Sequence, residues 1–118
     1  MENWETDFEW LRVRHWVKEK MGHDALPDLN AILFLIGIQE LGHVKDQFSK
    51  EEKQDLMHIA ICRLLSEDGY YEFEGLDTEG WPHWKPLRPF AVKGLKDQES
   101  VLIQKVIRYF KNEFLESS

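Results

Sequence analysis

Side chains that can bind a metal ion cluster on one predicted helix in the middle of the chain. Asp55, His58 and Cys62 follow one another at offsets of three and four residues, so their side chains project from one side of a helix. Carboxylate, imidazole and thiolate are all ligands for transition metals. Upstream, Glu40 and His43 have the Glu-x-x-His spacing that helical metal centres use. One hypothesis is therefore a metal-binding protein or metal-dependent enzyme, with a divalent transition metal held by these five residues.

A simpler interpretation of the same residues is structural. Asp55 and His58 lie on the side of the helix opposite its Leu and Ile residues, as solvated side chains do, and Cys62 lies at the border of that side. Glu40 falls in the last turn of its helix, where the helix dipole disfavours negative charge, so we expect Arg or Lys to pair with it. No motif of a nucleophilic cysteine and no glycine-rich phosphate-binding motif occurs in the sequence. We therefore expect a noncatalytic protein without a cofactor, and the metal site is the alternative.

A second candidate site lies in an aromatic segment near 70–87, where the period of the sequence changes from helical to alternating. A turn over 77–80 and a return segment with Pro82 and Pro86 predict a short β-hairpin, because proline suits only edge strands. The Trp81–Pro82 bond is a candidate for the cis form. Aromatic surface of this kind suits stacking or protein contact. The ligand-binding candidates are Tyr70, Phe73 and His83, and the protein-contact candidates are Tyr71, Trp81 and Trp84.

Four helices are predicted to position these residues, near 6–21, 28–41, 50–66 and 98–114. Two of them open with a capping-box pattern, Thr6 with Glu9 and Ser49 with Glu52. The second helix is apolar almost all round, which indicates a buried element with the others around it, and Gly37 permits a close neighbour. We therefore predict a mainly α fold with a buried second helix and an aromatic hairpin.

The first helix has two apolar stripes on nearly opposite sides, which one core cannot easily bury. We expect one stripe to pack inward and the other to contact a partner. The first stripe contains Trp4, Phe8, Leu11 and His15. The second stripe, which is the candidate interaction surface, contains Trp10, Val13, Val17 and Met21.

The composition indicates an acidic globular protein. The 118 residues are 42% hydrophobic and 31% charged with a net charge of -7, so we expect a single domain over 1–118. Since an acidic field repels phosphate groups, we expect neither nucleic acid nor an anionic membrane as a partner. A lone cysteine and the absence of a basic and then apolar segment at the N-terminus favour a cytoplasmic location.

These features together favour a noncatalytic interaction module that forms a homo-oligomer or binds another protein. The contact surface would be the first helix, the aromatic hairpin or both. Metal binding on the second and third helices and small-ligand binding at the hairpin are the two alternatives. The position of His58 relative to Glu40, His43 and His83 discriminates between them, because convergence in a cleft would favour an enzyme.

Overall fold

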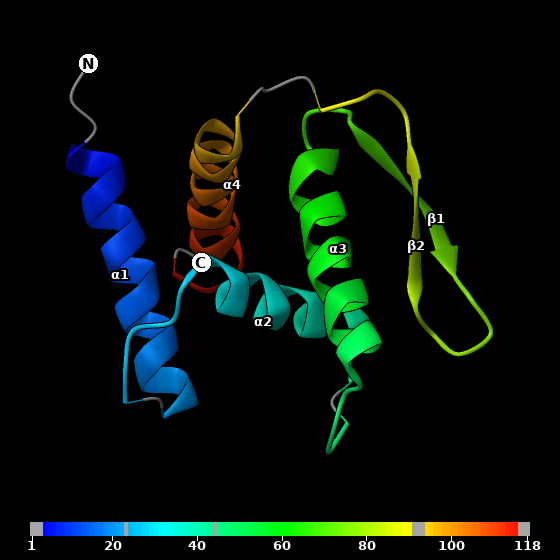
Figure 1. The fold of residues 1–118 in the computed structure, drawn as a ribbon, viewed down its shortest axis with the longest axis horizontal. Coiled ribbons are helices and arrows are strands. Elements are labelled where there is room, and N and C mark those ends of the chain that lie inside the picture. The colour runs from blue at the N-terminus through cyan, green and yellow to red at the C-terminus, as the bar shows by residue number, and fades with distance from the viewer. Residues whose placement is uncertain (1–3, 23, 44, 91–93, 116–118) are drawn as a thin grey trace. The chain divides into compact units, whose positions relative to one another are not determined.

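The computed structural model describes residues 4–22, 24–43, 45–90 and 94–115 (Figure 1). The described elements are α1 (Trp4–Met21), α2 (Leu29–Leu41), α3 (Lys50–Ser66), β1 (Tyr71–Leu76), β2 (Pro82–Pro86), α4 (Leu95–Phe110) and the π-helical turn η1 (Lys111–Leu115). The prediction of a mainly helical chain with an aromatic two-stranded hairpin is confirmed. None of the helices in these ranges combines the length and the hydropathy that crossing a membrane requires.

Two helices begin earlier than predicted. The α1 helix is already formed at Trp4, so Thr6 lies inside the helix and does not cap it. The α4 helix begins at Leu95, directly after Gly94 at a φ of 86°, whereas the predicted start was after Asp97. In both cases the helix begins upstream of the residue whose side chain favours a cap.

The chain divides into two compact units. One contains α1, α4 and η1, and the other contains α2 from Asn30 onward, α3 and the hairpin. Each unit has buried apolar side chains of its own. The prediction of a single domain over 1–118 stays a prediction.

In the first unit, α1 and α4 lie side by side (Figure 1). Aromatic rings cluster at the end of this pair, where the ring centroid of Trp16 lies 5.6 Å from that of Phe110 and 5.0 Å from that of Phe114. The amino group of Lys111 pairs with the Glu9 carboxylate at 3.2 Å, which joins η1 to α1. These contacts hold the C-terminal turn against α1.

In the second unit, α2 crosses α3 at Gly37. A Cβ atom on Gly37 would overlap the backbone carbonyl of Leu56 and would lie 2.9 Å from the Leu56 Cβ. This is the close approach that the sequence predicts for this glycine. Leu41, Leu56 and Ile59 form the core beside the crossing, with the partly buried Phe34, Ile38, Phe48 and Trp81 packed against it.

The α3 helix begins at the capping box that the sequence predicts. The Ser49 hydroxyl accepts a hydrogen bond from the Glu52 amide at 3.0 Å, and the Glu52 carboxylate accepts one from the Ser49 amide at 2.9 Å. Both bonds satisfy backbone donors that the first helical turn leaves unpaired. The start of α3 is therefore fixed by local chemistry.

The hairpin pairs β1 and β2 antiparallel, with Tyr71 opposite Pro86 and Phe73 opposite Trp84. The register shifts between Phe73 and Gly75, and Gly75 adopts a φ of 109° that other residues rarely adopt. The Trp81–Pro82 bond, whose isomer the sequence left open, is trans. Both strands contact α3, which supports a hairpin too short to be stable by itself.

Candidate functional site

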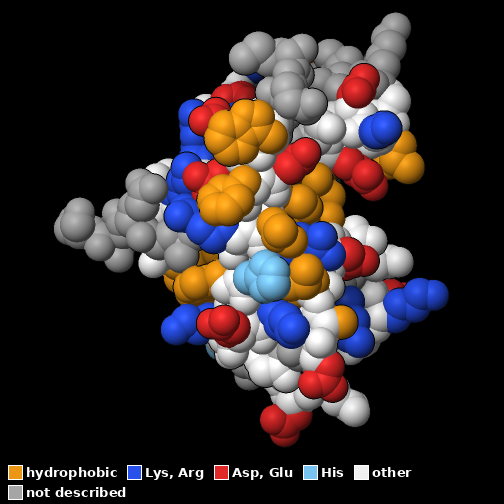
Figure 2. Space-filling view, turned by 90° about the vertical axis from the view of Figure 1, so that its left-hand side faces the viewer, with side chains coloured by type: hydrophobic (Ala, Val, Ile, Leu, Met, Phe, Trp, Pro, Cys, Tyr) orange, Lys and Arg blue, Asp and Glu red, His pale blue; other side chains and the backbone are white. Residues whose placement is uncertain are grey.

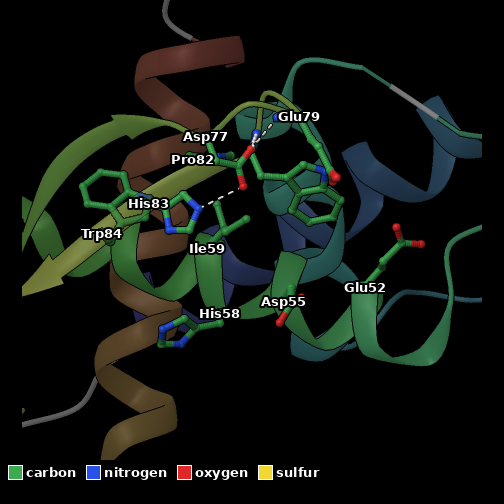
Figure 3. A pocket seen from close by; sticks show the side chains of 10 residues that line it. Glu52, Asp55, His58, Ile59, Asp77, Glu79, Pro82, His83 and Trp84 are labelled. Atoms are coloured by element: carbon green, nitrogen blue, oxygen red, sulfur yellow. Dashed lines mark hydrogen bonds and ion pairs between the residues drawn. The ribbon is translucent and has the colours of Figure 1, made fainter.

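An open groove of about 530 Å³ lies between α3 and the hairpin (Figure 3). Figure 3 shows Asp55 and His58 on α3 across from Asp77 and His83 on the hairpin. The groove therefore joins two segments that are about 20 residues apart in the sequence. Its full lining is Glu52, Asp55, His58, Ile59, Asp77, Glu79, Trp81, Pro82, His83 and Trp84.

Two contacts anchor the hairpin wall of the groove. Trp81 packs against the core that includes Leu56 and Ile59, and Pro82 is buried beside it. At the other end of the hairpin, the Tyr71 ring meets the His58 ring edge to face, with centroids 6.2 Å apart. Large side chains thus fix both ends of the hairpin on α3, which gives the groove preformed walls.

Asp77 organises the turn of the hairpin. One carboxylate oxygen accepts hydrogen bonds from the amides of Glu79 at 2.9 Å and Trp81 at 3.0 Å. The other lies 3.0 Å from Nε2 of His83, whose side chain is 58% exposed. The bond from the Trp81 amide is the largest cause that lowers the pKa of Asp77, followed by the bond with His83. Asp77 is therefore a carboxylate whose charged form the turn stabilises.

The groove is strongly acidic. Four of its lining residues carry carboxylates, Glu52, Asp55, Asp77 and Glu79, and the lining contains neither Lys nor Arg. Lys45 bonds to the Glu52 carboxylate at 2.7 Å, and this bond is the largest cause that lowers the pKa of Glu52. Within the described ranges, no ion pair or hydrogen bond engages the carboxylates of Asp55 and Glu79. These two groups can bind a cation from outside.

The five predicted metal ligands do not converge on one site, although Asp55 and His58 line the same groove and Cys62 lies beside His58. Glu40 lies 3.6 Å from the Arg63 guanidinium, which confirms the predicted basic partner, and His43 is exposed and does not line the groove. Cys62 is fully buried, whereas the sequence placed it at the border of the solvated side. In the part of the chain that the structure describes, no three or more His, Cys, Asp or Glu side chains form a group that could hold a metal ion.

The packing of the hairpin on α3 explains the burial of Cys62, and this burial affects its thiol. Burial raises the pKa of the Cys62 thiol to about 11, which keeps it protonated at neutral pH. Its sulfur lies 3.5 Å from Nε2 of His58, and the ring of Tyr71 from β1 packs on that histidine. The hairpin thus packs on the side of α3 that the sequence predicts to be solvated.

Of the histidines, His58 and His83 line the same groove, and His43 does not. Among the ligand-binding candidates, only His83 reaches the groove. Tyr70 packs against Phe90, with ring centroids 5.3 Å apart, and Phe73 packs against Trp84 at the same distance. Trp81 and Trp84 line the groove, so the predicted aromatic contact surface and this groove overlap.

On α1, the structure shows which stripe is buried. Val13 and Val17 lie in the core, so these two cannot form an exposed contact surface as predicted. Trp10 is partly buried and Met21 is exposed. The other stripe is outside, with Trp4, Phe8 and Leu11 all exposed.

Sequence reasoning missed three acidic residues of the groove, Glu52, Asp77 and Glu79. Asp77 carries a usable signal, because an Asp at the start of a turn hydrogen-bonds to amides two residues or more ahead. No local signal places Glu52 or Glu79 there, since charged residues of this kind are common on any surface.

In comparisons with known proteins, no family model, no curated protein and no solved structure matches this chain.

Proposed function

We propose that this chain is a noncatalytic protein-interaction module, and that the groove between α3 and the hairpin binds a basic segment of a partner protein. The observation that carries the proposal is the combination of unpaired carboxylates and tryptophan rings in a preformed groove. Asp55 and Glu79 supply the negative charge, and Trp81 and Trp84 supply the aromatic surface.

This lining suits the side chains of Arg and Lys. A guanidinium or ammonium group gains roughly 0.5–1 kcal/mol over the face of an exposed aromatic ring, and more where the contact excludes water. A carboxylate beside the ring adds a charge-assisted hydrogen bond. Arg is the better match, because its flat guanidinium stacks on a ring and binds a carboxylate with two N–H groups.

A partner protein fits the groove better than a small molecule does. Pockets for small molecules enclose most of their ligand and are lined mainly by hydrophobic side chains. This groove is open, and carboxylates and imidazoles dominate its lining. An extended chain can place one or two side chains into such a groove and leave the rest of its length outside.

The lining also favours binding over nucleophilic catalysis. His83 and Asp77 resemble a base and the carboxylate that orients it, at 3.0 Å. The described lining, however, contains no Ser, Thr, Cys or Lys that His83 could activate. Two bonds to backbone amides give Asp77 a structural role in the turn instead.

The acidic groove repels phosphate groups, so the proposal includes neither nucleic acid nor an anionic membrane as a partner. A cytoplasmic location belongs to the same proposal. Its support is that the sequence has a single cysteine, Cys62, so that no disulfide can form within the chain.

The test is a titration with two synthetic peptides, one of alternating Arg and Gly and one of alternating Glu and Gly, followed by tryptophan fluorescence and calorimetry. We expect the Arg peptide to bind and the Glu peptide not to bind. The double variant Asp55→Asn with Glu79→Gln should weaken binding by roughly 2- to 30-fold, because two partly exposed ion pairs contribute about 0.2–1 kcal/mol each.

The matched control is Glu72→Gln with Glu74→Gln, which removes the same charge from exposed positions of β1 outside the groove. Long-range electrostatics would affect both double variants equally, whereas a groove site affects only the first. The proposal is wrong if the two double variants bind the Arg peptide with the same affinity, or if the Glu peptide binds as well as the Arg peptide.

A further inference from the structure

The exposed side of α1 has the pattern of a helix-pairing seam. Trp4, Phe8 and Leu11 are 64%, 60% and 43% exposed, and His15, the next residue of the stripe, is also exposed. Figure 2 shows hydrophobic side chains on the surface between charged ones. Spacings of four, three and four residues keep one stripe in line with a partner helix, as in a coiled coil.

The stripe borders a recess within the first unit. Trp4 and Phe8 of α1 and Ile107 of α4 line an open groove of about 640 Å³, together with the polar side chains of Glu5, Thr6, Glu9, Gln104 and Lys111. Exposed apolar surface of this kind often marks a protein contact site. The seam therefore offers projecting aromatic side chains next to a groove with polar walls.

Charge identifies the occupant as a second copy of this chain. The N-terminal half of α1 carries Glu5, Asp7 and Glu9, and the C-terminal half carries Arg12, Arg14, Lys18 and Lys20 with Glu19. When two copies of α1 pair antiparallel, the acidic half of each lies against the basic half of the other. Parallel pairing would instead place the two acidic halves against each other, and likewise the two basic halves.

The charged residues beside the stripe are correctly placed for such pairs. Glu5 and Arg12 lie on one flank of the seam and Asp7 and Arg14 on the other, in the positions where paired helices form salt bridges. Three of these four residues are exposed, and Arg14 is partly buried. Within the chain, Arg14 Nε donates to the Pro27 carbonyl at 2.8 Å, and Arg12 pairs with Glu9 at 3.1 Å. A two-fold axis near the middle of the stripe brings Glu5 of one copy near Arg12 of the other, and Asp7 near Arg14.

We infer that two copies of this chain form an antiparallel two-fold dimer through α1, with Phe8 of one copy beside Leu11 of the other and Trp4 beside His15. The seam runs along α1, which is about 27 Å long at 1.5 Å per residue. One helix pair of this length gives a small interface, so the dimer forms and dissociates with concentration. The seam shares no residue with the groove between α3 and the hairpin.

The test is sedimentation velocity over concentrations from low micromolar to several hundred micromolar. We expect the wild-type chain to shift from monomer to dimer across this range. Leu11→Glu should weaken association by about ten-fold or more, since dimerisation would then bury a charge in an apolar seam. The matched control is Leu95→Glu, which places the same residue at a position of α4 that is 75% exposed and outside the stripe.

Both variants change exposed positions, and circular dichroism checks that each retains its helices. The inference is overturned if the Leu11→Glu variant dimerises as well as the wild-type chain. It is also overturned if Leu95→Glu weakens dimerisation as much as Leu11→Glu does. A wild-type chain that stays monomeric at all these concentrations overturns it as well.

Cross-linking tests the orientation. We expect a short bismaleimide to join the variant Glu5→Cys to the variant Arg12→Cys when the two are mixed, because antiparallel pairing brings these positions together. Glu5→Cys by itself should cross-link much less, since its two copies then lie far apart along the seam. The wild-type chain is the control for Cys62, which is buried. Efficient cross-linking of Glu5→Cys to itself would show parallel pairing and overturn the antiparallel arrangement.

Discussion

The crossing of α2 over α3 makes a sharp prediction for the substitution Gly37→Ala. In a free helix this change stabilises by about 1 kcal/mol, because alanine is a much better helix former than glycine. In this structure the added Cβ would overlap the Leu56 carbonyl group and would lie 2.9 Å from the Leu56 Cβ. The carbonyl belongs to the backbone of α3 and cannot rotate away as a side chain can.

Relief of that overlap requires the two helices to move apart around a core that contains Leu41, Leu56 and Ile59. Overpacking of this kind typically costs 1–3 kcal/mol, and here it acts on the backbone of both helices. Because the overlap is with backbone, we place the cost at the upper end of this range. After the gain of about 1 kcal/mol in helix propensity, we expect Gly37→Ala to lower the free energy of unfolding by about 2 kcal/mol.

The assay is urea denaturation followed by circular dichroism at 222 nm, with Gln39→Ala as the control. Gln39 is exposed in the same helix, so its replacement by alanine changes helix propensity without changing the crossing. We expect the control to be neutral or slightly stabilising. A Gly37→Ala variant that is as stable as the control, or more stable, would refute the close approach of α2 to α3.

Two further predictions concern titratable groups. The folded state lowers the pKa of Asp77 below its ordinary value of 3.8, so its contribution to stability is full above pH 4 and is lost as the pH falls through the folded pKa. Asp77→Ala should therefore lower the urea midpoint at pH 7, and the difference from wild type should shrink toward pH 3; a constant difference would contradict this linkage. Cys62 should react with a disulfide reagent at pH 8 only as fast as the chain opens, because burial raises the pKa of its thiol to about 11. Labelling of the native protein as fast as that of urea-unfolded protein would show that the thiol is accessible.

Local signals explain which parts of the fold the sequence predicts. The capping box of Ser49 and Glu52 is complete within four residues, so the start of α3 can be recognised without knowledge of its neighbours. Gly22 and Gly42 follow α1 and α2 with positive φ angles of 68° and 89°, which marks both helix ends. Thr6 shows the limit of such signals, because the same pattern lies inside α1 where the helix has already formed.

The candidate site depends on contacts that no local pattern encodes. Helical spacing correctly places Asp55 and His58 on one side of α3, but it does not show that the hairpin packs there. Cys62 shows the consequence, because its burial beside His58 follows from the position of Tyr71 on a distant strand. Glu79 reaches the groove only because Asp77 closes the turn toward α3.

The two stripes of α1 are a similar case. Both are apolar and both have helical spacing, so the sequence cannot rank them. The structure buries the stripe with the smaller side chains, Val13 and Val17, and exposes the stripe with Trp4 and Phe8. Burial of the larger aromatic side chains would remove more apolar surface from water, at about 25 cal/mol per Å². Their exposure in a single chain is therefore costly unless a second surface covers them.

The two proposed surfaces have no residue in common and belong to different units of the chain. Substitutions at separate sites without shared partners usually have additive effects. Leu11→Glu should therefore leave the affinity of one chain for one Arg peptide unchanged, and Asp55→Asn with Glu79→Gln should leave dimerisation unchanged.

A dimer of this chain carries two acidic grooves. A partner with two basic segments gains affinity only when both grooves are engaged at once. Self-association and peptide recognition would then be linked through the number of grooves in the assembly, with no change in either site.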